Sequence, residues 1–202
     1  IYLANAFNAV VGYFEDYPES EWICGDTLMF GEGFPTEIVR AVVPKSAAHA
    51  LSWAYKAPQP GMFWKRQLLG AGFDEQWRYD FDHDFYVRLL LAGHRCEHLR
   101  AALAAYRLHE MSKTVAESHR FDDEFDRSAE VYESSLQGAD RRWCRATRFL
   151  RRSYAASEAG NKRESARWLM RALATHPESL AHRPFWGCLR KLATSGPASG
   201  TD

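Results

Sequence analysis

The sequence predicts an α/β fold followed by an α-helical extension, and two patterns lead to that prediction. Up to about residue 115, short β-branched and aromatic runs alternate with segments of helical periodicity, which is typical of α/β architecture. Between residues 116 and 195, apolar residues recur only at helical spacing. With 202 residues, 46% of them hydrophobic and 26% charged, the chain is long enough for one good-sized domain and a helical appendage. We expect a partial domain over residues 1–115, a helical extension over 116–195 and a disordered tail over 196–202.

The first quarter of the chain is predicted to supply a helix, two strands and a short second helix. Leu3–Tyr17 carries an apolar stripe at helical spacing. Trp22–Gly25 is a short strand-like run, and β-branched Ile38–Val43 is the returning strand after a turn rich in Gly and Pro at 31–35. Ser46–Tyr55 is predicted to be a short helix with Ser46 as its N-cap.

The next segment is predicted to continue the alternation. An extended loop through Pro58 and Pro60 precedes two helices, Met62–Leu69 and Phe81–Ala92, and Gly93 stops the second in a left-handed conformation. Two separate strands are then expected, at 95–99 and 103–108. The helices predicted after them are Ala116–Leu136, Asp140–Ser157, Lys162–Thr175 and Leu180–Ala193.

Charge is unevenly distributed along the chain. Residues 139–195 hold thirteen Lys and Arg but four Asp and Glu, a local charge of +9 in a chain whose net charge is zero. Basic residues interleaved with aromatics on a helix can contact an anionic membrane or a phosphate-bearing acceptor. The alternative is pairing with the acidic helix that precedes them. No recognised nucleic-acid-binding motif accompanies the charge, so nucleic acid is not an expected partner.

The cysteine pattern and hydropathy bear on the cellular compartment. Cys24, Cys96, Cys144 and Cys188 lie far apart with no metal-ligand spacing, so we expect reduced, mostly buried thiols and a cytoplasmic protein. No apolar run reaches the roughly 18–20 residues that a spanning helix needs. Because Ile1 is not an initiator Met and resembles the middle of a chain, we expect the sequence to be a fragment of a longer protein.

A cluster of acids among aromatics marks the most informative stretch. Asp74, Glu75, Asp80, Asp82 and Asp84 fall within eleven residues, framed by Trp77, Tyr79, Phe81 and Phe85. A carboxylate held among aromatics and near other acids has a raised pKa, as a general base requires. The structural alternatives are that Asp82 caps the helix and that Asp84 forms a surface ion pair with Arg88 at i, i+4.

Five motifs in order resemble the second half of a family 2 glycosyltransferase. They are Gln59-Pro60-Gly61-Met62-Phe63-Trp64-Lys65-Arg66-Gln67-Leu68, Gly72-Phe73-Asp74-Glu75, Tyr79-Asp80-Phe81-Asp82-His83-Asp84-Phe85-Tyr86-Val87-Arg88-Leu89, Tyr106-Arg107-Leu108-His109 and Ser112-Lys113-Thr114. The resemblance covers about residues 1–115. It implies the acceptor-side portion of a GT-A (Rossmann-like) domain. It also implies transfer of a sugar, with inversion, from a nucleotide-sugar to a hydroxyl acceptor in polysaccharide synthesis.

The resemblance also implies roles for particular residues. Asp82 falls on the second residue of the family's acidic pair, the presumed general base, whereas Phe81 replaces the first. Arg107, His109 and Lys113 would face the diphosphate, His109 could touch a divalent cation (Mn²⁺ or Mg²⁺), and Gln59 could line the acceptor pocket. The alternative for the first three is an ordinary basic strand exit. His83, beside the acids, is expected to be a structural or surface group rather than a ligand. Trp64 could equally line the acceptor pocket or belong to the hydrophobic core. We interpret Asp26 as a turn-forming residue.

The same resemblance places the nucleotide-binding half and the main cation ligands before Ile1. We therefore expect this chain alone to be inactive. The expected partners are a nucleotide-sugar donor, a glycan or lipid-linked acceptor and, peripherally, the inner face of the membrane. A different class of function stays open, in which the helices are a non-catalytic interaction module on a degenerate transferase remnant.

Overall fold

A computed structural model describes residues 1–52 and 58–194 of the chain and has a mixed α/β architecture. The chain falls into two compact units, Ile1–Ala50 with Tyr55–Ser128 and Leu51–Ala54 with Ala129–Asp202. We call them the sheet unit and the helical unit. The division lies within helix α5 (Ser118–Glu133), later in the chain than residue 115. The tail over 196–202 and the end of the helix expected over Ser46–Tyr55 lie outside the described residues.

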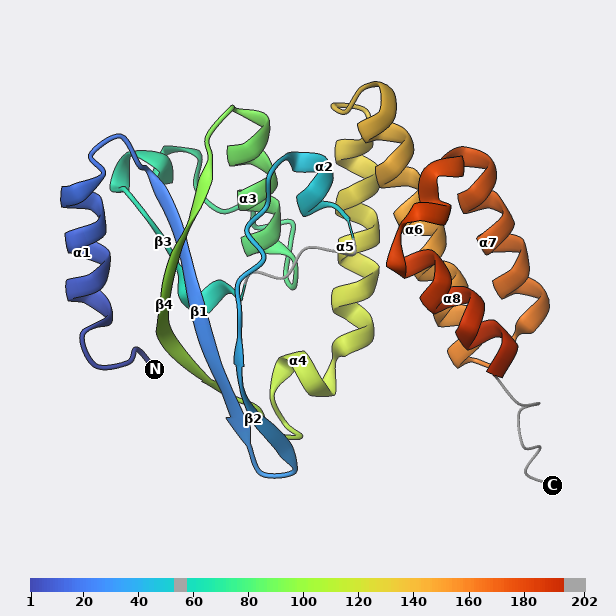
Figure 1. Ribbon diagram of the computed structural model, residues 1–202, viewed down its shortest axis with the longest axis horizontal. Helices are drawn as coiled ribbons and strands as arrows, with labels where there is room; N and C mark the ends of the chain where they lie inside the picture. The colour runs from blue at the N-terminus through green and yellow to red at the C-terminus, as the bar shows by residue number, and fades with distance from the viewer. Residues whose placement is uncertain (53–57, 195–202) are drawn as a thin grey trace. The chain divides into compact units, whose positions relative to one another are not determined.

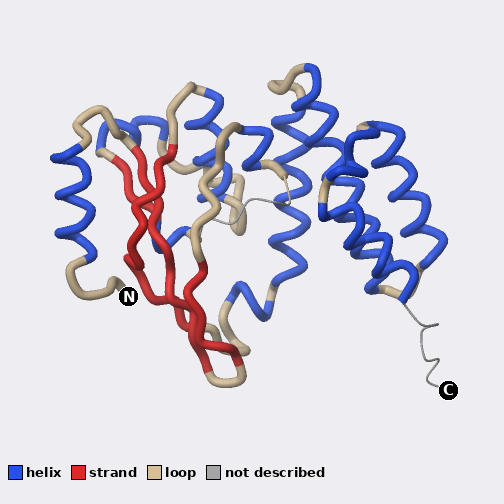
Figure 2. The backbone as a smooth tube through the Cα atoms, viewed as in Figure 1, coloured by secondary structure: helices blue, strands red, loops and turns tan. Residues whose placement is uncertain are grey.

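The sheet unit is built around β1 (Trp22–Gly31). Strand β4 (Cys96–Arg107) pairs with β1 in parallel along one side. On the other side, β3 (Met62–Trp64) and β2 (Phe34–Val39) pair with β1 antiparallel, β3 along its first half and β2 along its second (Figure 2). A mixed four-stranded sheet results, in which the carboxyl ends of β1 and β4 lie side by side, with Phe30 opposite Arg107.

Helices cover both faces of the sheet (Figure 1). Helix α1 (Ala6–Asp16) packs through Ala6 and Val10 against Ile23 and Leu103. Helix α3 (Phe81–Leu91) packs on the opposite face, where its buried residues join the core cluster of Trp22, Cys24, Met62, Leu68, Phe85, Tyr86 and Leu89. Because both faces are buried, the start of β1 is a continuous apolar run rather than an alternating one.

Several short elements connect these layers. They are α2 (Ala47–Ala50), the 3-10 helices η1 (Gln59–Gly61) and η2 (Arg66–Ala71), and α4 (Lys113–Ala116). The predicted cap at Ser46 is confirmed, since its Oγ accepts the His49 N–H at 3.1 Å. Gly93 ends α3 with φ 93°, also as predicted. Gly61 lies so close to the Gly25 carbonyl that a Cβ there would meet its oxygen at 2.4 Å.

Three predictions about local structure were wrong. Residues 62–64 are a strand, not the start of a helix, because they pair with Trp22–Cys24 of β1. The two strands predicted at 95–99 and 103–108 are one strand, whose pairing to β1 shifts register near Asp26. Asp26 is not turn-forming, because it lies within β1 and accepts hydrogen bonds from Ala41 N (3.0 Å) and His98 Nε2 (2.8 Å).

The helical unit has a core of its own. Helices α6 (Gly138–Glu158), α7 (Lys162–Thr175) and α8 (Arg183–Thr194), with the 3-10 helix η3 (Pro177–Ala181), bury Ala146, Leu150, Leu169, Ala172, Phe185 and Cys188. The predicted bounds of α7 are confirmed, and its cap is Asn161, whose side chain accepts the Glu164 N–H at 3.2 Å. Ser165 Oγ lies 3.0 Å from Ser153 Oγ and 2.7 Å from Ser157 Oγ, a buried polar contact between α6 and α7.

Basic residues of α6 form ion pairs with the acidic helix α5 that precedes it. Glu133 accepts from Arg145 and, at 3.1 Å, from Arg148, and Arg148 also lies 3.2 Å from Glu130. Burial alone would raise the pKa of Glu133, but the hydrogen bond and charge of Arg145 and the charge of Arg148 hold it below its ordinary value. The pairing alternative therefore accounts for these two arginines.

The prediction that the cysteines are free and mostly buried is confirmed. All four cysteines are free, with Cys24, Cys144 and Cys188 buried and Cys96 half-buried.

Candidate active site at the start of helix α3

Helix α3 directs its first turn toward the carboxyl ends of the parallel strand pair. A short turn of four residues, 92–95, joins Leu91 at its end to Cys96 at the start of β4, so α3 and β4 run in opposite directions (Figure 1). The first turn of α3 therefore points toward the end of β4 that carries Arg107. The crevice outside the carboxyl ends of parallel strands is the usual ligand site of open α/β sheets.

A glutamate from α5 fixes the backbone that enters this turn. The carboxylate of Glu124 accepts three consecutive backbone N–H groups, those of Arg78 (3.3 Å), Tyr79 (2.7 Å) and Asp80 (3.1 Å). Charge-assisted bonds of this kind are stronger than neutral ones. The loop before α3 is thereby held to the segment that follows β4.

Tyr79 and Lys113 strengthen the same connection. Tyr79 donates its hydroxyl to Glu117, and Arg120 donates to the Tyr79 oxygen at 2.9 Å. The hydrogen bond from Tyr79 lowers the pKa of Glu117. Lys113 donates to the Arg78 carbonyl at 2.6 Å and lies 4.1 Å from the Tyr79 ring centroid. Of the candidate residues after β4, Lys113 is the one that these contacts bring to the entrance of α3.

His83 is a buried structural residue, which is one of the two roles expected for it. Its Nδ1 lies 3.1 Å from Asp80 Oδ2, its Nε2 lies 2.9 Å from the Ala50 carbonyl, and its ring stacks on Phe125. Both ring nitrogens face acceptors, which favours the doubly protonated imidazolium. Burial alone would lower the pKa of His83, but the charge and hydrogen bond of Asp80 and the Ala50 carbonyl raise it above its ordinary value.

Asp82 lies in the first turn of α3, beside this buried pair, and is half-buried. Its Oδ1 accepts the His83 backbone N–H at 2.8 Å. Burial raises the pKa of Asp82, and the bond from the His83 backbone and the His83 charge offset only part of that effect. Asp80, not Asp82, occupies the N-cap position, and its side chain makes no capping bond. The N-cap position expected for Asp82 under the capping alternative is therefore wrong, whereas its contact with a first-turn N–H agrees with that alternative.

Asp84 and Arg88 form the predicted i, i+4 pair, but the pair is not on the surface. The Asp84 side chain is 0% exposed and accepts from Arg88 Nε at 2.9 Å. Arg88 also donates to the Gly72 carbonyl at 2.7 Å, so it ties α3 to the preceding loop. A buried ion pair of this kind needs such additional hydrogen bonds to offset its desolvation.

The remaining candidate residues are exposed. Arg107 ends β4 and His109 follows it, and the Leu108 N–H donates to the Phe30 carbonyl at 2.7 Å, which extends the β1–β4 pairing. Gln59 begins η1. Over residues 1–52 and 58–194, no hydrogen bond or ion pair joins Asp82 to Arg107, His109, Lys113 or Gln59. Trp64 packs against Phe85 and Tyr86, in agreement with its core alternative.

The described residues do not by themselves form a divalent-cation site. No group of three His, Cys, Asp or Glu side chains within them is arranged to hold a metal ion. Asp80 and His83 bond to each other, and His109 lies alone at the end of β4. The possible cation ligand His109 therefore has no partner ligands among the described residues.

Comparisons with protein-family models, with curated proteins and with solved structures found no match. None of the helices in the described ranges is both long and apolar enough to cross a membrane.

Sequence reasoning missed the residues that hold the site together. Glu117 and Glu124 were visible only as members of an acidic helix, and no local pattern distinguishes them from their exposed neighbour Asp123. Their roles depend on how α5 meets the loop before α3, which sequence spacing does not encode.

Proposed function

We propose that this chain is the acceptor-side portion of a family 2 glycosyltransferase of GT-A type, with Asp82 as its general base. The observation that carries the proposal is the environment of Asp82. Asp82 is a half-buried carboxylate of raised pKa. It lies in the first turn of α3, and that turn faces toward the carboxyl ends of the parallel strands β1 and β4. Of the five motifs that resemble the family, Tyr79–Leu89 contains this turn, and Lys113 of the last motif bonds to the Arg78 carbonyl directly before it.

In the proposed reaction, Asp82 removes the proton of an acceptor hydroxyl as its oxygen attacks the anomeric carbon of a nucleotide-sugar. The C–O bond to the nucleoside diphosphate breaks, and the anomeric configuration inverts. A carboxylate of raised pKa is a stronger base than an ordinary one, which suits this task. Arg107 and Lys113 are the cationic groups proposed to offset charge on the leaving diphosphate, and His109 is proposed to face the diphosphate beside them.

The fixed loop before α3 is the second support for the proposal. General base catalysis requires a side chain held within hydrogen-bond reach of its proton. The three backbone bonds to Glu124 and the Tyr79–Glu117 contact hold residues 78–80, directly before Asp82. A divalent cation, Mn²⁺ or Mg²⁺, is expected from the family resemblance alone.

The cellular setting is part of the proposal. We place the enzyme in the cytoplasm, acting on a glycan or lipid-linked acceptor in polysaccharide synthesis. Contact with the inner face of the membrane would use basic residues of the helical unit other than Arg145 and Arg148, which are paired with Glu133.

The experiment that tests the proposal is a screen of nucleotide-sugars with the complete natural protein, in the presence of Mn²⁺ or Mg²⁺. Binding or hydrolysis of at least one nucleotide-sugar is expected, because the proposed reaction uses a nucleotide-sugar as its donor. Failure of every donor both to bind and to be hydrolysed would reject the proposal.

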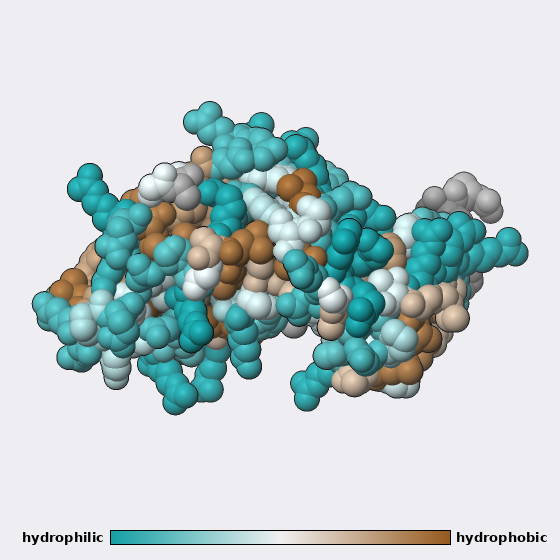
Figure 3. Space-filling model, turned by 90° about the horizontal axis from the view of Figure 1, so that it is seen from above, coloured by the Kyte–Doolittle hydropathy of each residue, from teal (hydrophilic) through white to brown (hydrophobic). Residues whose placement is uncertain are grey.

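A second candidate function is a protein-interaction module formed by the helical unit. The observation that favours it is an independent core that leaves large apolar side chains outside, among them Met170 (63% exposed) and Trp186 (54%). Figure 3 shows apolar surface gathered on one side of this unit. Exposed apolar patches of this kind mark interaction surfaces. Under this alternative, removal of Asp82 would leave the protein's function unchanged.

A further inference from the structure

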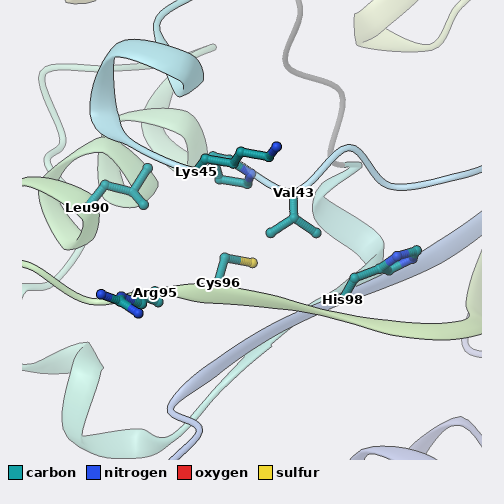
Figure 4. A pocket seen from close by; sticks show the side chains of 7 residues that line it. Val43, Lys45, Leu90, Arg95, Cys96 and His98 are labelled. Atoms are coloured by element: carbon teal, nitrogen blue, oxygen red, sulfur yellow. The ribbon is translucent and has the colours of Figure 1, made fainter. Parts of the chain in front are cut away.

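A pocket in the sheet unit lies away from the first turn of α3. It has a volume of about 410 Å³ and is lined by Val43, Pro44, Lys45, Leu90, Arg95, Cys96 and His98 (Figure 4). Leu90 belongs to the last turn of α3 and Cys96 begins β4, so the pocket lies at the opposite end of α3 from Asp82. The volume falls within the range of small-molecule sites, roughly 300–1,000 Å³.

The floor of this pocket is apolar. Val43, Pro44 and Leu90 contribute aliphatic surface, and in Figure 4 the side chains of Val43 and Cys96 point into the space between the Val43–Lys45 segment and β4. Burial raises the pKa of the Cys96 thiol, so this side chain is a neutral lining group rather than a thiolate. A ligand of this floor needs an apolar body.

The charged groups of the pocket are all basic. Lys45 and Arg95 are exposed at its rim, and among the residues that the structure describes neither side chain has a hydrogen bond or ion pair. Within residues 1–52 and 58–194, no carboxylate lines the pocket. Two cations without ion-pair partners among the lining residues create a positive potential that attracts anions.

Neighbouring carboxylates are engaged elsewhere. Strand alternation puts Glu97 on the other face of β4, where it accepts from the Tyr13 hydroxyl at 3.2 Å. Glu21 bonds to His94 at 2.7 Å. Asp26 bonds to His98 Nε2 and to the Ala41 N–H, which fixes the His98 ring at the pocket wall. The Asp26 carboxylate is thus engaged by His98 and Ala41, and among the described residues no carboxylate pairs with the side chain of Lys45 or Arg95.

We propose that this pocket binds a small organic anion, with its apolar body on Val43, Pro44 and Leu90 and its carboxylate or phosphate attracted by the basic lining residues Lys45 and Arg95. The required ligand chemistry is an acidic head on a compact apolar body. The inference is independent of the proposed transferase activity, because it uses none of the residues around Asp82.

Cys96 supplies a direct readout of occupancy. Cys24, Cys144 and Cys188 are each 0% exposed, whereas Cys96 is half-buried and lines the pocket. Burial raises the pKa of all four thiols, so alkylation by N-ethylmaleimide is slow and is measured at alkaline pH by mass spectrometry. Cys96 is expected to be modified first because it alone of the four has exposed surface. A ligand in the pocket slows that modification.

The test compares three probes on the native protein: benzoate, its neutral counterpart benzyl alcohol, and inorganic phosphate. Benzoate is expected to slow Cys96 alkylation saturably, at least fivefold, while the other two at equal concentration have little effect. In the double variant Lys45→Gln/Arg95→Gln, the benzoate concentration for half-protection is expected to rise at least tenfold. Arg100→Gln removes one exposed cation of the same strand outside the pocket and is expected to leave protection unchanged.

The proposal is overturned by any of four results. They are no protection by benzoate, equal protection by benzyl alcohol, equal protection by inorganic phosphate, and unchanged half-protection in the double variant. Because Lys45 and Arg95 are exposed, the double variant is expected to fold, and its circular dichroism spectrum checks that.

Discussion

The carboxylate of Glu124 accepts the backbone N–H of Tyr79 at 2.7 Å, across 45 positions of the sequence. The same carboxylate also bonds the N–H groups of Arg78 and Asp80. This contact ties the segment after β4 to the loop that enters α3. It makes the position of Asp82 depend on a residue that belongs to neither the loop nor the sheet.

Glu124→Gln is expected to destabilise the sheet unit by about 2 kcal/mol, because a neutral amide replaces the charged acceptor of three N–H groups. Chemical denaturation with urea measures the change. Asp123→Asn is the matched control, since Asp123 is exposed on the same helix, and its effect is expected to stay within about 0.5 kcal/mol. Equal effects of the two substitutions would show that the Glu124 contact does not stabilise the fold.

His83→Gln is expected to cost about 3 kcal/mol, because it leaves the buried carboxylate of Asp80 without its cationic partner. The pKa of His83 is raised in the folded state. Its stabilising contribution is therefore complete below the ordinary histidine pKa and is lost as pH rises through the folded-state value. Urea titrations between pH 5 and pH 9 are expected to show this loss in the wild type and a flatter profile in the variant. Parallel profiles would contradict the assignment.

Glu133→Gln is expected to destabilise the helical unit by about 3 kcal/mol, since Arg148 is 6% exposed and would lose one of its two carboxylate partners. The folded-state pKa of Glu133 is lowered, so the stability from this contact is present above the ordinary glutamate pKa and is lost as pH falls through the folded-state value. Glu158→Gln removes the carboxylate partner of Lys191 and serves as the control, with a much smaller expected change, because this ion pair is open to solvent. Thermal unfolding of both variants at neutral pH separates the two cases.

Asp82→Asn is expected to raise stability at neutral pH. Because the folded-state pKa of Asp82 is raised, the folded protein disfavours the ionised form, and stability falls as pH rises from the ordinary aspartate pKa through the folded-state value. A neutral amide removes that cost, which is about 1.4 kcal/mol for each unit of pKa difference. A higher unfolding temperature than wild type at pH 7 supports this account, and a lower one contradicts it.

The elements that local signals define could be predicted from the sequence. The bounds of α7 follow from Asn161 at its start and Pro177 beyond its end, and the end of α3 follows from Gly93. Residues 62–64 could not be predicted as a strand, because their conformation is decided by pairing with β1. The candidate site divides in the same way. Asp82 is identified by its local setting, whereas Glu117 and Glu124 act through partners far away in the chain.

The central claim, that Asp82 is a general base, is tested most directly by glycosyl transfer with the complete protein carrying Asp82→Asn, beside the Asp123→Asn control. A general base contributes roughly 10²–10⁴-fold to the rate. The account predicts a loss of turnover in that range for Asp82→Asn with donor binding and fold retained, and wild-type turnover for Asp123→Asn. Near-normal turnover of Asp82→Asn, with the fold intact, would contradict it.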